Sequence, residues 1–227
     1  MNFLASNIQW LQKQQGISTK VLAKKCGVTE KKLTSLDKDP GSVPVAWVLA
    51  FSDIFEVPVG TLLQVDLRLK QKKQKAIQLL VLDIDGVLTD GGMYYAESGN
   101  EYKKFNTKDG LAIKRLTRQG MQVAFLSNGI NKKLVESRAK LLGVQKVYVG
   151  TEEKLTILDS WLKELKLTYK QVAYVGDDIN DLAVIKKAGF SACPSDASIP
   201  VQEKVHVILS RKGGDACVRE FIDLYFS

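Results

Sequence analysis

The sequence predicts an α/β domain built on a parallel sheet and preceded by a small all-α domain. Three observations support this fold class. After residue 76, short apolar and β-branched runs alternate with helix-like segments; before residue 67, apolar side chains follow only a helical spacing; and a basic stretch separates the two regions. Alternation of strands and helices is typical of parallel sheets, because each helix returns the chain to the start of the next strand.

The first region, residues 1–66, is predicted to hold short helices around a small core. Its middle part reads as a helix, a turn at residues 26–28 and a second helix. Thr29 is a suitable N-cap for the second helix, because its hydroxyl can accept a hydrogen bond from a free backbone N–H. The apolar side chains expected between the two helices are Ala23, Val28, Leu33 and Leu36.

Residues 67–76 are predicted to be a linker, either helical or extended. The stretch RLKQKKQK at 68–75 is polar and basic and lacks Pro and Gly. Residues 1–75 carry +6 of the formal net charge of +8. Such an excess is typical of modules that bind nucleic acid, but also of an ordinary solvated surface, so charge alone does not separate the two.

The composition excludes several classes of protein. Of the 227 residues, 45% are hydrophobic and 26% charged, which is typical of a globular chain and not of a disordered one. No apolar run approaches the roughly 20 residues of a membrane helix, and residues 1–11 lack the pattern of a signal peptide. Cys26, Cys193 and Cys217 are far apart and form no CxxC motif, so we expect a cytoplasmic protein.

The second region, residues 77–227, is predicted to be one α/β domain. Strands are expected in IQLLVLDID (77–85), QVAFLSN (122–128), KVYVG (146–150) and QVAYVGDD (171–178). Helices are expected at 110–119, 131–142 and 152–165. These elements predict a Rossmann-like parallel sheet with helices on both faces.

Two acidic clusters directly follow predicted strands. Asp83 and Asp85 come after the first strand, where two carboxylates two residues apart can divide the work of a nucleophile and a general acid/base. Asp177, Asp178 and Asp181 follow a later strand. Because ligands bind beyond the carboxyl ends of parallel strands, we expect both clusters in one crevice. An all-oxygen, negative pocket suits Mg²⁺ better than Zn²⁺.

Ser127 and Lys154 lie between the two acidic clusters, each just past a predicted strand. A hydroxyl and an ammonium beside a magnesium site are suited to holding phosphate oxygens. The four elements in this order, DxDGVLTD, Ser, Lys and GDDxND, resemble the haloacid dehalogenase superfamily over residues 77–227.

The resemblance implies a role for each of these residues. Asp83 would attack phosphorus to form an aspartyl-phosphate, and Asp85 would act as general acid and then base. Mg²⁺ would be held by the carboxylate of Asp83, the backbone carbonyl of Asp85 and Asp177. The transferring phosphoryl group would be bound by Ser127, by the backbone near Asn128 and by Lys154. Asp178 and Asp181 would support the metal or Lys154, and helix capping is an equal alternative for Asp178.

Residues 91–110 read as a β-hairpin, with aromatic residues on both arms and a turn at 98–100. Asp85 and Ser127 are 42 residues apart, and this interval must also hold the helix at 110–119, which leaves room for the hairpin but not for a large cap. The hairpin, QVAYVGDDIND and the tail KGGDACVREF resemble phosphatases of phosphorylated sugar acids, which act on 3-deoxy-octulosonate 8-phosphate or nonulosonate 9-phosphates. The resemblance implies a homotetramer in which the hairpin of one subunit helps to close the site of the next.

Two positions bear on the choice between the two substrates, and a third bears on recognition of the sugar carboxylate. The hairpin and the tail are nearer the nonulosonate branch, because Asp215 replaces an Arg of the octulosonate enzymes. Gly129 stands where nonulosonate enzymes can carry an acid. Arg138 matches a family arginine suited to a sugar carboxylate, although a solvated helix face explains it equally well.

The first region resembles the helix-turn-helix of the Cro/repressor family over roughly residues 4–65. The resemblance implies that the second helix enters the major groove and directs Lys31, Lys32 and Thr34 at DNA. Glu30 opens that helix with a charge that repels phosphate, so oligomerisation or docking of a partner is the alternative.

The sequence as a whole predicts a Mg²⁺-dependent phosphomonoester hydrolase acting on a sugar-acid phosphate. The alternative is a DNA-binding transcription regulator that uses the phosphatase-like domain as a metabolite sensor. The presence of both Asp83 and Asp85 favours the enzyme, because a sensor has no need of the pair.

Overall fold

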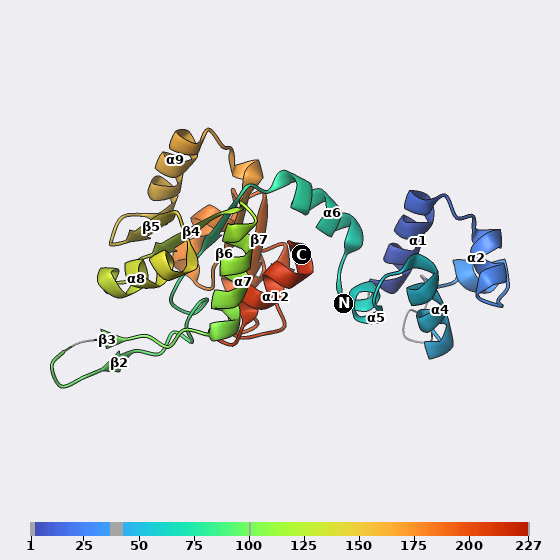
Figure 1. Cartoon of the computed structure of the whole chain (residues 1–227), viewed down its shortest axis with the longest axis horizontal. Coiled ribbons are helices and arrows are strands. Elements are labelled where there is room, and N and C mark those ends of the chain that lie inside the picture. Colours follow the sequence, from blue (N-terminus) through green and yellow to red (C-terminus); the bar gives the residue numbers. More distant parts are fainter. Residues whose placement is uncertain (1–2, 37–42, 100, 227) are drawn as a thin grey trace. The chain divides into compact units, whose positions relative to one another are not determined.

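The computed structural model describes residues 3–36, 43–99 and 101–226. It divides into two compact units, Met1–Lys72 and Lys73–Ser227. Figure 1 shows the helices and strands of both units. In the described part of the chain, no helix combines the length and the apolar character needed to cross a bilayer.

The described residues of the first unit form helices joined by turns and loops, with no strand among them. Its helices are α1 (Leu4–Gln15), α2 (Thr19–Lys25), α3 (Glu30–Thr34), α4 (Val45–Phe55) and α5 (Val59–Gln64). The predicted turn separates α2 from α3, and Thr29 caps α3 by accepting a hydrogen bond from the Lys32 N–H. Ala23, Leu33 and Leu36 are buried as expected, and Val28 is half-buried.

A buried asparagine closes the core of the first unit. The side-chain amide of Asn7 donates to the carbonyls of Leu62, at 2.9 Å, and Val65, at 2.7 Å, and its oxygen accepts from the Leu67 N–H at 3.0 Å. These three bonds satisfy backbone groups left free where α5 ends. They also hold the start of the next helix, α6 (Leu67–Ala76), which occupies the stretch predicted as a linker.

The second unit is built on a six-stranded sheet with the order β5-β4-β1-β6-β7-β8. Its strands are β1 (Leu79–Leu82), β4 (Gln122–Ser127), β5 (Lys146–Val149), β6 (Val172–Val175), β7 (Phe190–Cys193) and β8 (Val207–Ile208). All neighbouring strands are parallel, which confirms the predicted sheet. The four residues of β1 and of β6 are fully buried, because both strands are central and covered on both faces.

Helices cover both faces of this sheet. They are α7 (Thr107–Arg118), α8 (Lys132–Leu142), α9 (Lys154–Leu165), α10 (Leu182–Ile185), α11 (Ile199–Gln202) and α12 (Cys217–Tyr225). Leu79 and Val81 of β1 pack in one cluster with residues of α9, α10 and α11. The alternate residues Leu80 and Leu82 point to the other face, where α7 and α12 pack together (Figure 1).

A short hairpin stands between β1 and α7, as predicted. Its strands are β2 (Tyr94–Tyr95) and β3 (Glu101–Tyr102), which pair in antiparallel register. The expected turn at 98–100 includes Asn100, which lies outside the described residues. In the described part of the chain, β2 and β3 are the only helices or strands between β1 and α7. This segment therefore contains a hairpin and no large cap domain.

Candidate active site

The carboxyl ends of β1, β4 and β6 bring the predicted acids together. Because β1 lies between β4 and β6 in the sheet, the loops that follow the three strands are neighbours. They form a crevice of about 380 Å³. The residues lining it are Asp83, Asp85, Gly86, Gly91, Ser127, Asn128, Gly129, Asp177, Asp178, Ile179 and Asn180.

Asp83 is held by two donors at the end of β1. Its Oδ1 accepts from the Ile84 N–H at 2.7 Å, and its Oδ2 lies 2.9 Å from the Lys154 ammonium. The residue is only 4% exposed. Burial, followed by the charge of Asp181, raises the pKa of Asp83 well above its usual range, and Lys154 opposes this shift. The site therefore concentrates negative charge that one ammonium does not balance.

Asp181 is fully buried and organises the groups around it. Its Oδ1 accepts from the Lys154 ammonium at 2.6 Å and from the Tyr174 hydroxyl. Its Oδ2 accepts from the backbone N–H groups of Asp177, at 2.9 Å, and Asp178, at 3.3 Å. Burial lowers the pKa of Lys154, but the charges of Asp83 and Asp181 outweigh burial and raise it, so Lys154 is a fixed ammonium.

The carboxylates form a set suited to a divalent cation. Oxygens of Asp83, Asp177 and Asp181 lie within 4.8 Å of one another. Of these three, Asp83 and Asp177 line the crevice and Asp181 does not, so Asp83 and Asp177 are the carboxylates that a metal in the crevice could reach. Burial and then the charge of Asp181 raise the pKa of Asp177 to about 7. A cation relieves this repulsion, and hard oxygen ligands fit Mg²⁺.

A glycine makes room for the carboxylate of Asp177. A Cβ on Gly86 would lie 2.0 Å from Asp177 Oδ2, and the backbone there has φ of 81°. Both the close approach and the left-handed conformation require glycine. The Gly of the DxDG motif is therefore part of the geometry that places Asp177 beside the loop of Asp83.

Asp85 lines the same crevice, where one of its carboxylate oxygens accepts hydrogen bonds and the other faces the open space. Its Oδ1 lies 2.6 Å from the ammonium of Lys103, which comes from the hairpin arm, and 3.5 Å from the Thr89 hydroxyl. A Cβ on Gly129 would lie 3.1 Å from Asp85 Oδ2 and 3.1 Å from Ser127 Oγ, so Oδ2 and Ser127 face one space. The sequence-based interpretation missed Lys103, because nothing in its local sequence marks it.

Ser127 and Asn128 lie where predicted, at the end of β4. Ser127 is buried, and its Oγ accepts from the Gly129 N–H at 3.0 Å. The Asn128 side chain donates to the carbonyls of Gly150, at 3.1 Å, and Glu152, at 3.0 Å. Asn128 thus ties the loop after β4 to the loop that leads into Lys154, and its side chain serves the scaffold.

Two predicted site residues have local structural partners. The Asp178 side chain accepts from the Ile179 N–H at 2.8 Å and caps the 3₁₀ turn Ile179–Asp181, which is the capping alternative. Arg138, on α8, donates to the Asn106 carbonyl at 3.4 Å and lies over the Phe105 ring. Arg138 is not among the described residues that line the acidic crevice, so the fold of one subunit does not bring it there.

The C-terminal tail packs against the loop that carries Asp83 and Asp85. The Gly214 N–H donates to the Val87 carbonyl at 3.0 Å, and a Cβ on Gly213 would lie 1.9 Å from the Gly86 carbonyl oxygen. The two glycines therefore allow backbone-to-backbone contact. Asp215 itself is exposed and lies 3.7 Å from the Arg211 guanidinium.

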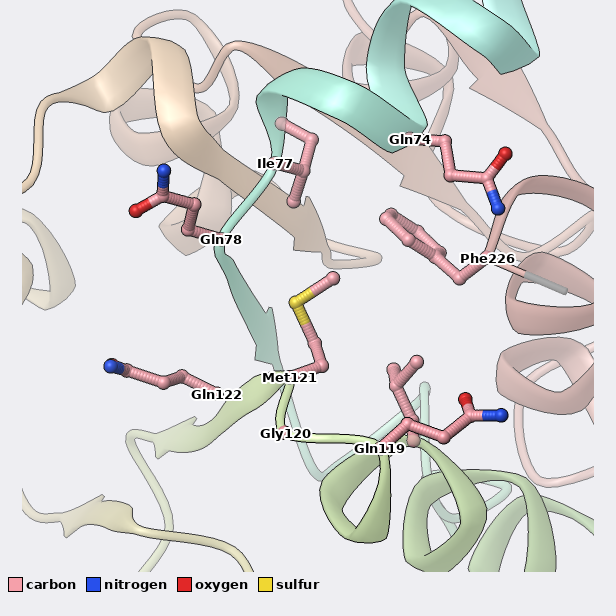
Figure 2. A pocket seen from close by; sticks show the side chains of 9 residues that line it. Gln74, Ile77, Gln78, Gln119, Gly120, Met121, Gln122 and Phe226 are labelled. Carbon is pink, nitrogen blue, oxygen red and sulfur yellow. The ribbon is translucent and has the colours of Figure 1, made fainter.

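A second hollow, of about 430 Å³, lies at the opposite end of the strands. It is formed where β1 and β4 begin, and Figure 2 shows Met121, Ile77 and Phe226 pointing toward its centre with glutamine side chains around them. Its described lining offers amides, a thioether and apolar groups, and no acid, base or nucleophile. The acidic crevice is therefore the site that carries chemistry.

Comparison with known proteins agrees with this geometry. A family model for haloacid dehalogenase-like hydrolases matches residues 102–189. The 3-deoxy-D-manno-octulosonate 8-phosphate phosphatase KdsC of Yersinia pestis is 39% identical over 148 residues, which cover 65% of this chain and 79% of that enzyme. The chain belongs to the KdsC-like phosphatases of the haloacid dehalogenase superfamily.

Solved KdsC-like phosphatases share the fold. A probable YrbI family phosphatase from Pseudomonas syringae is 44% identical, with a TM-score of 0.67 over 69% of this chain and 89% of that one. The octulosonate 8-phosphate phosphatase of Moraxella catarrhalis, solved with magnesium, phosphate and KDO, is 32% identical, with a TM-score of 0.67 over 70% of this chain and 91% of that one. Like its relatives, this KdsC-like chain is a phosphatase.

Proposed function

We propose that this chain removes phosphate from 3-deoxy-octulosonate 8-phosphate, with Mg²⁺ as cofactor and an aspartyl-phosphate on Asp83 as intermediate. The observation that carries the proposal is the placement of Asp83, fixed by Ile84 and Lys154, in one crevice with Asp85 and Asp177. This arrangement joins a nucleophile, an acid/base and a metal site.

The proposed reaction has two steps. An oxygen of Asp83 attacks phosphorus, the bond from phosphorus to the sugar oxygen breaks, and Asp85 gives its proton to that oxygen. Asp85 then accepts a proton from the water that attacks the aspartyl-phosphate and releases inorganic phosphate. When bound, Mg²⁺ neutralises charge between the nucleophile and the phosphate. The phosphoryl oxygens are held by Ser127, by the backbone near Asn128 and by Lys154.

The alternative substrate is a nonulosonate 9-phosphate. Asp215, in place of the Arg of the octulosonate tail, points to that branch. The KdsC relatives of Yersinia pestis and Moraxella catarrhalis point to the octulosonate branch, and they match over most of their length. We give the relatives more weight, because they match over most of their own length, whereas Asp215 is a single exposed residue that pairs with Arg211.

Phosphate release by the purified full chain tests this proposal. The substrates are octulosonate 8-phosphate, nonulosonate 9-phosphates and simple sugar phosphates, each with Mg²⁺ and with EDTA. We expect metal-dependent turnover that favours the octulosonate ester and is abolished in Asp83→Asn. Preference for a nonulosonate ester would overturn the substrate, and equal turnover in EDTA would overturn the metal.

We also propose a homotetramer in which the hairpin helps to close a neighbouring site. Tyr94, Tyr95 and Tyr102 are 49%, 57% and 60% exposed on the hairpin, which supports contact with another subunit. Light scattering of the wild type and of a Tyr94→Ser, Tyr102→Ser double variant tests this. A wild type that is monomeric at assay concentrations would overturn the proposal.

For the N-terminal module, residues 1–66, we propose DNA binding of the helix-turn-helix kind. Lys31, Lys32 and Thr34 are exposed along α3, as a reading helix requires. Salt-dependent binding of duplex DNA by the full chain, lost in Lys31→Ala, Lys32→Ala, tests the module. Deletion of residues 1–70 tests the division at the linker 67–76, because we expect residues 77–227 to keep phosphatase activity. If the deletion loses DNA binding and the full chain lacks turnover, the regulator replaces the enzyme.

A further inference from the structure

A buried ammonium from the hairpin arm sits beside the acid/base of the site. The side chain of Lys103 is only 5% exposed, and its Nζ lies 2.6 Å from Asp85 Oδ1 and 2.7 Å from Glu101 Oε1. Burial lowers the pKa of Lys103, but its bonds to Asp85 and Glu101 outweigh burial and raise it. Lys103 is therefore charged, and a charged group is buried only where partners hold it.

Lys103 makes the two oxygens of Asp85 different. Oδ1 accepts from Lys103 and lies near Thr89, whereas Oδ2 faces the space it shares with Gly129 and Ser127. An oxygen that already accepts a charge-assisted hydrogen bond is the poorer place for a proton. The proton of a protonated Asp85 then resides on Oδ2, the oxygen that faces the crevice.

The arm that carries Lys103 is itself anchored. The Glu101 carbonyl accepts from the side-chain amide of Asn131 at 2.9 Å, and the Glu101 side chain is 6% exposed. The next residue, Lys104, is very different, because its side chain is 70% exposed and pairs with Asp90 at 3.3 Å. Two adjacent lysines of one arm thus offer a buried residue and a matched exposed control.

We propose that Lys103 is a positioning residue for Asp85: it fixes the carboxyl rotamer and reserves Oδ2 for proton transfer to the leaving oxygen. The hairpin thereby contributes to chemistry within its own subunit. Among the described residues that line the acidic crevice, Asp85 is present and Lys103 is not, so Lys103 acts through Asp85 and not on the substrate. This inference rests on the proposed role of Asp85 as general acid.

The dependence on the leaving group tests this role. An alkyl alcohol leaves only with a proton, whereas p-nitrophenolate leaves without one. General acid catalysis contributes about 10²- to 10⁴-fold. With Lys103→Met we expect kcat to fall at least ~10²-fold for octulosonate 8-phosphate and for glycerol 3-phosphate, but less than ~10-fold for p-nitrophenyl phosphate, with KM little changed. Asp85→Asn is the reference and should show the same selective loss.

The controls separate positioning from general damage. Lys104→Met should leave both substrate classes unchanged. Glu101→Gln keeps the Lys103–Asp85 bond and removes only the negative charge of the second partner, so we expect a smaller fall in kcat that again affects the alkyl esters more than the aryl ester. It also replaces Lys103→Met as the test if circular dichroism shows that the latter does not fold.

Equal losses on alkyl and aryl esters in a folded Lys103→Met variant, or no loss at all, would overturn the inference. The inference would also be overturned if kcat fell selectively for alkyl esters in Asp85→Asn but not in Lys103→Met. Failure of the wild type on octulosonate 8-phosphate alone would overturn the proposed substrate and leave Lys103 testable with glycerol 3-phosphate and p-nitrophenyl phosphate.

Discussion

Tyr174, fully buried in β6, donates its hydroxyl to Oδ1 of Asp181, the same oxygen that accepts from the Lys154 ammonium. A buried strand residue that does not itself line the crevice thus helps to fix the lysine that holds Asp83. Burial, together with the charge of Asp181, raises the pKa of Tyr174, so the hydroxyl stays protonated and remains a donor.

Tyr174→Phe should lower both stability and turnover. Removal of one partner of a buried, charged acceptor costs about 1–3 kcal/mol of unfolding free energy. Asp181 and Lys154 remain, so we expect kcat to fall by roughly one order of magnitude, the equivalent of ~1.4 kcal/mol. Urea unfolding and steady-state kinetics measure the two effects. The control is Tyr169→Phe, whose hydroxyl bonds Asp159 at the surface, and equal losses in the two variants would contradict the prediction.

Lys154→Met should abolish turnover and destabilise the fold. It removes the one ammonium between Asp83 and Asp181, and breaking a buried ion pair on one side costs about 3–5 kcal/mol. Addition of Mg²⁺ should restore part of this stability, because the cation screens the same carboxylates. Thermal melts with and without Mg²⁺ measure it. The matched change is Lys163→Met, at an exposed position of α9, which should alter neither turnover nor stability.

Gly86→Ala should weaken the response to Mg²⁺ specifically. The new methyl group would occupy the space of Asp177 Oδ2 and displace that carboxylate. Gly99 has a similar φ of 79°, but a Cβ added there would meet nothing within 4 Å, so Gly99→Ala carries the backbone strain alone. We expect the Mg²⁺ concentration for half-maximal activity to rise at least ~10-fold in Gly86→Ala only, or ~1.4 kcal/mol. An unchanged Mg²⁺ response would show that Asp177 does not bind the metal.

Asp109 should make stability depend on pH between about 4 and 6. Its Oδ1 accepts from the Arg219 N–H at 2.6 Å where α12 begins, and burial raises its pKa from 3.8 to about 6. The folded state binds this proton more tightly than the unfolded state does. The stabilisation by protonated Asp109 is therefore fully present below pH 4 and is lost as pH rises through 6. The difference amounts to about 3 kcal/mol by linkage.

Asp109→Asn removes this titration and keeps the acceptor for Arg219. We expect the variant to be more stable than the wild type at pH 7.5 and equal to it near pH 4, as measured by urea unfolding across this range. The matched change is Asp159→Asn at the surface. A wild-type advantage that grows with pH would reverse the sign and contradict the raised pKa.

Much of the fold and of the site could be predicted from local sequence. Apolar runs such as residues 79–82 mark central strands, and the acids that follow them mark the carboxyl edge of the sheet. The positions of Asp83, Ser127 and Asp177 in one crevice confirm that reasoning. Tyr174 also carried a signal, because a buried tyrosine hydroxyl in an otherwise apolar strand needs a partner.

Other contacts had no local signal. Lys103 lies 18 residues from Asp85 on a polar hairpin arm, where a lysine is ordinarily solvated. Arg138 shows the reverse case: a suitable charge at a suitable helix position that the fold directs to Phe105 and Asn106. In both cases the direction of a long side chain depends on packing between segments that are distant in the chain.

The parallel sheet, the order of the motifs along it and the edge at which they meet all follow from the amino-acid sequence, because strand pattern and chain order are local properties. Which oxygens remain free for chemistry depends instead on the folded arrangement. Both oxygens of Asp181 are taken by donors, whereas Asp85 keeps Oδ2 for the crevice. Hydrogen-bond partners are set by distances of a few ångströms between remote residues, and those distances exist only once the chain has folded.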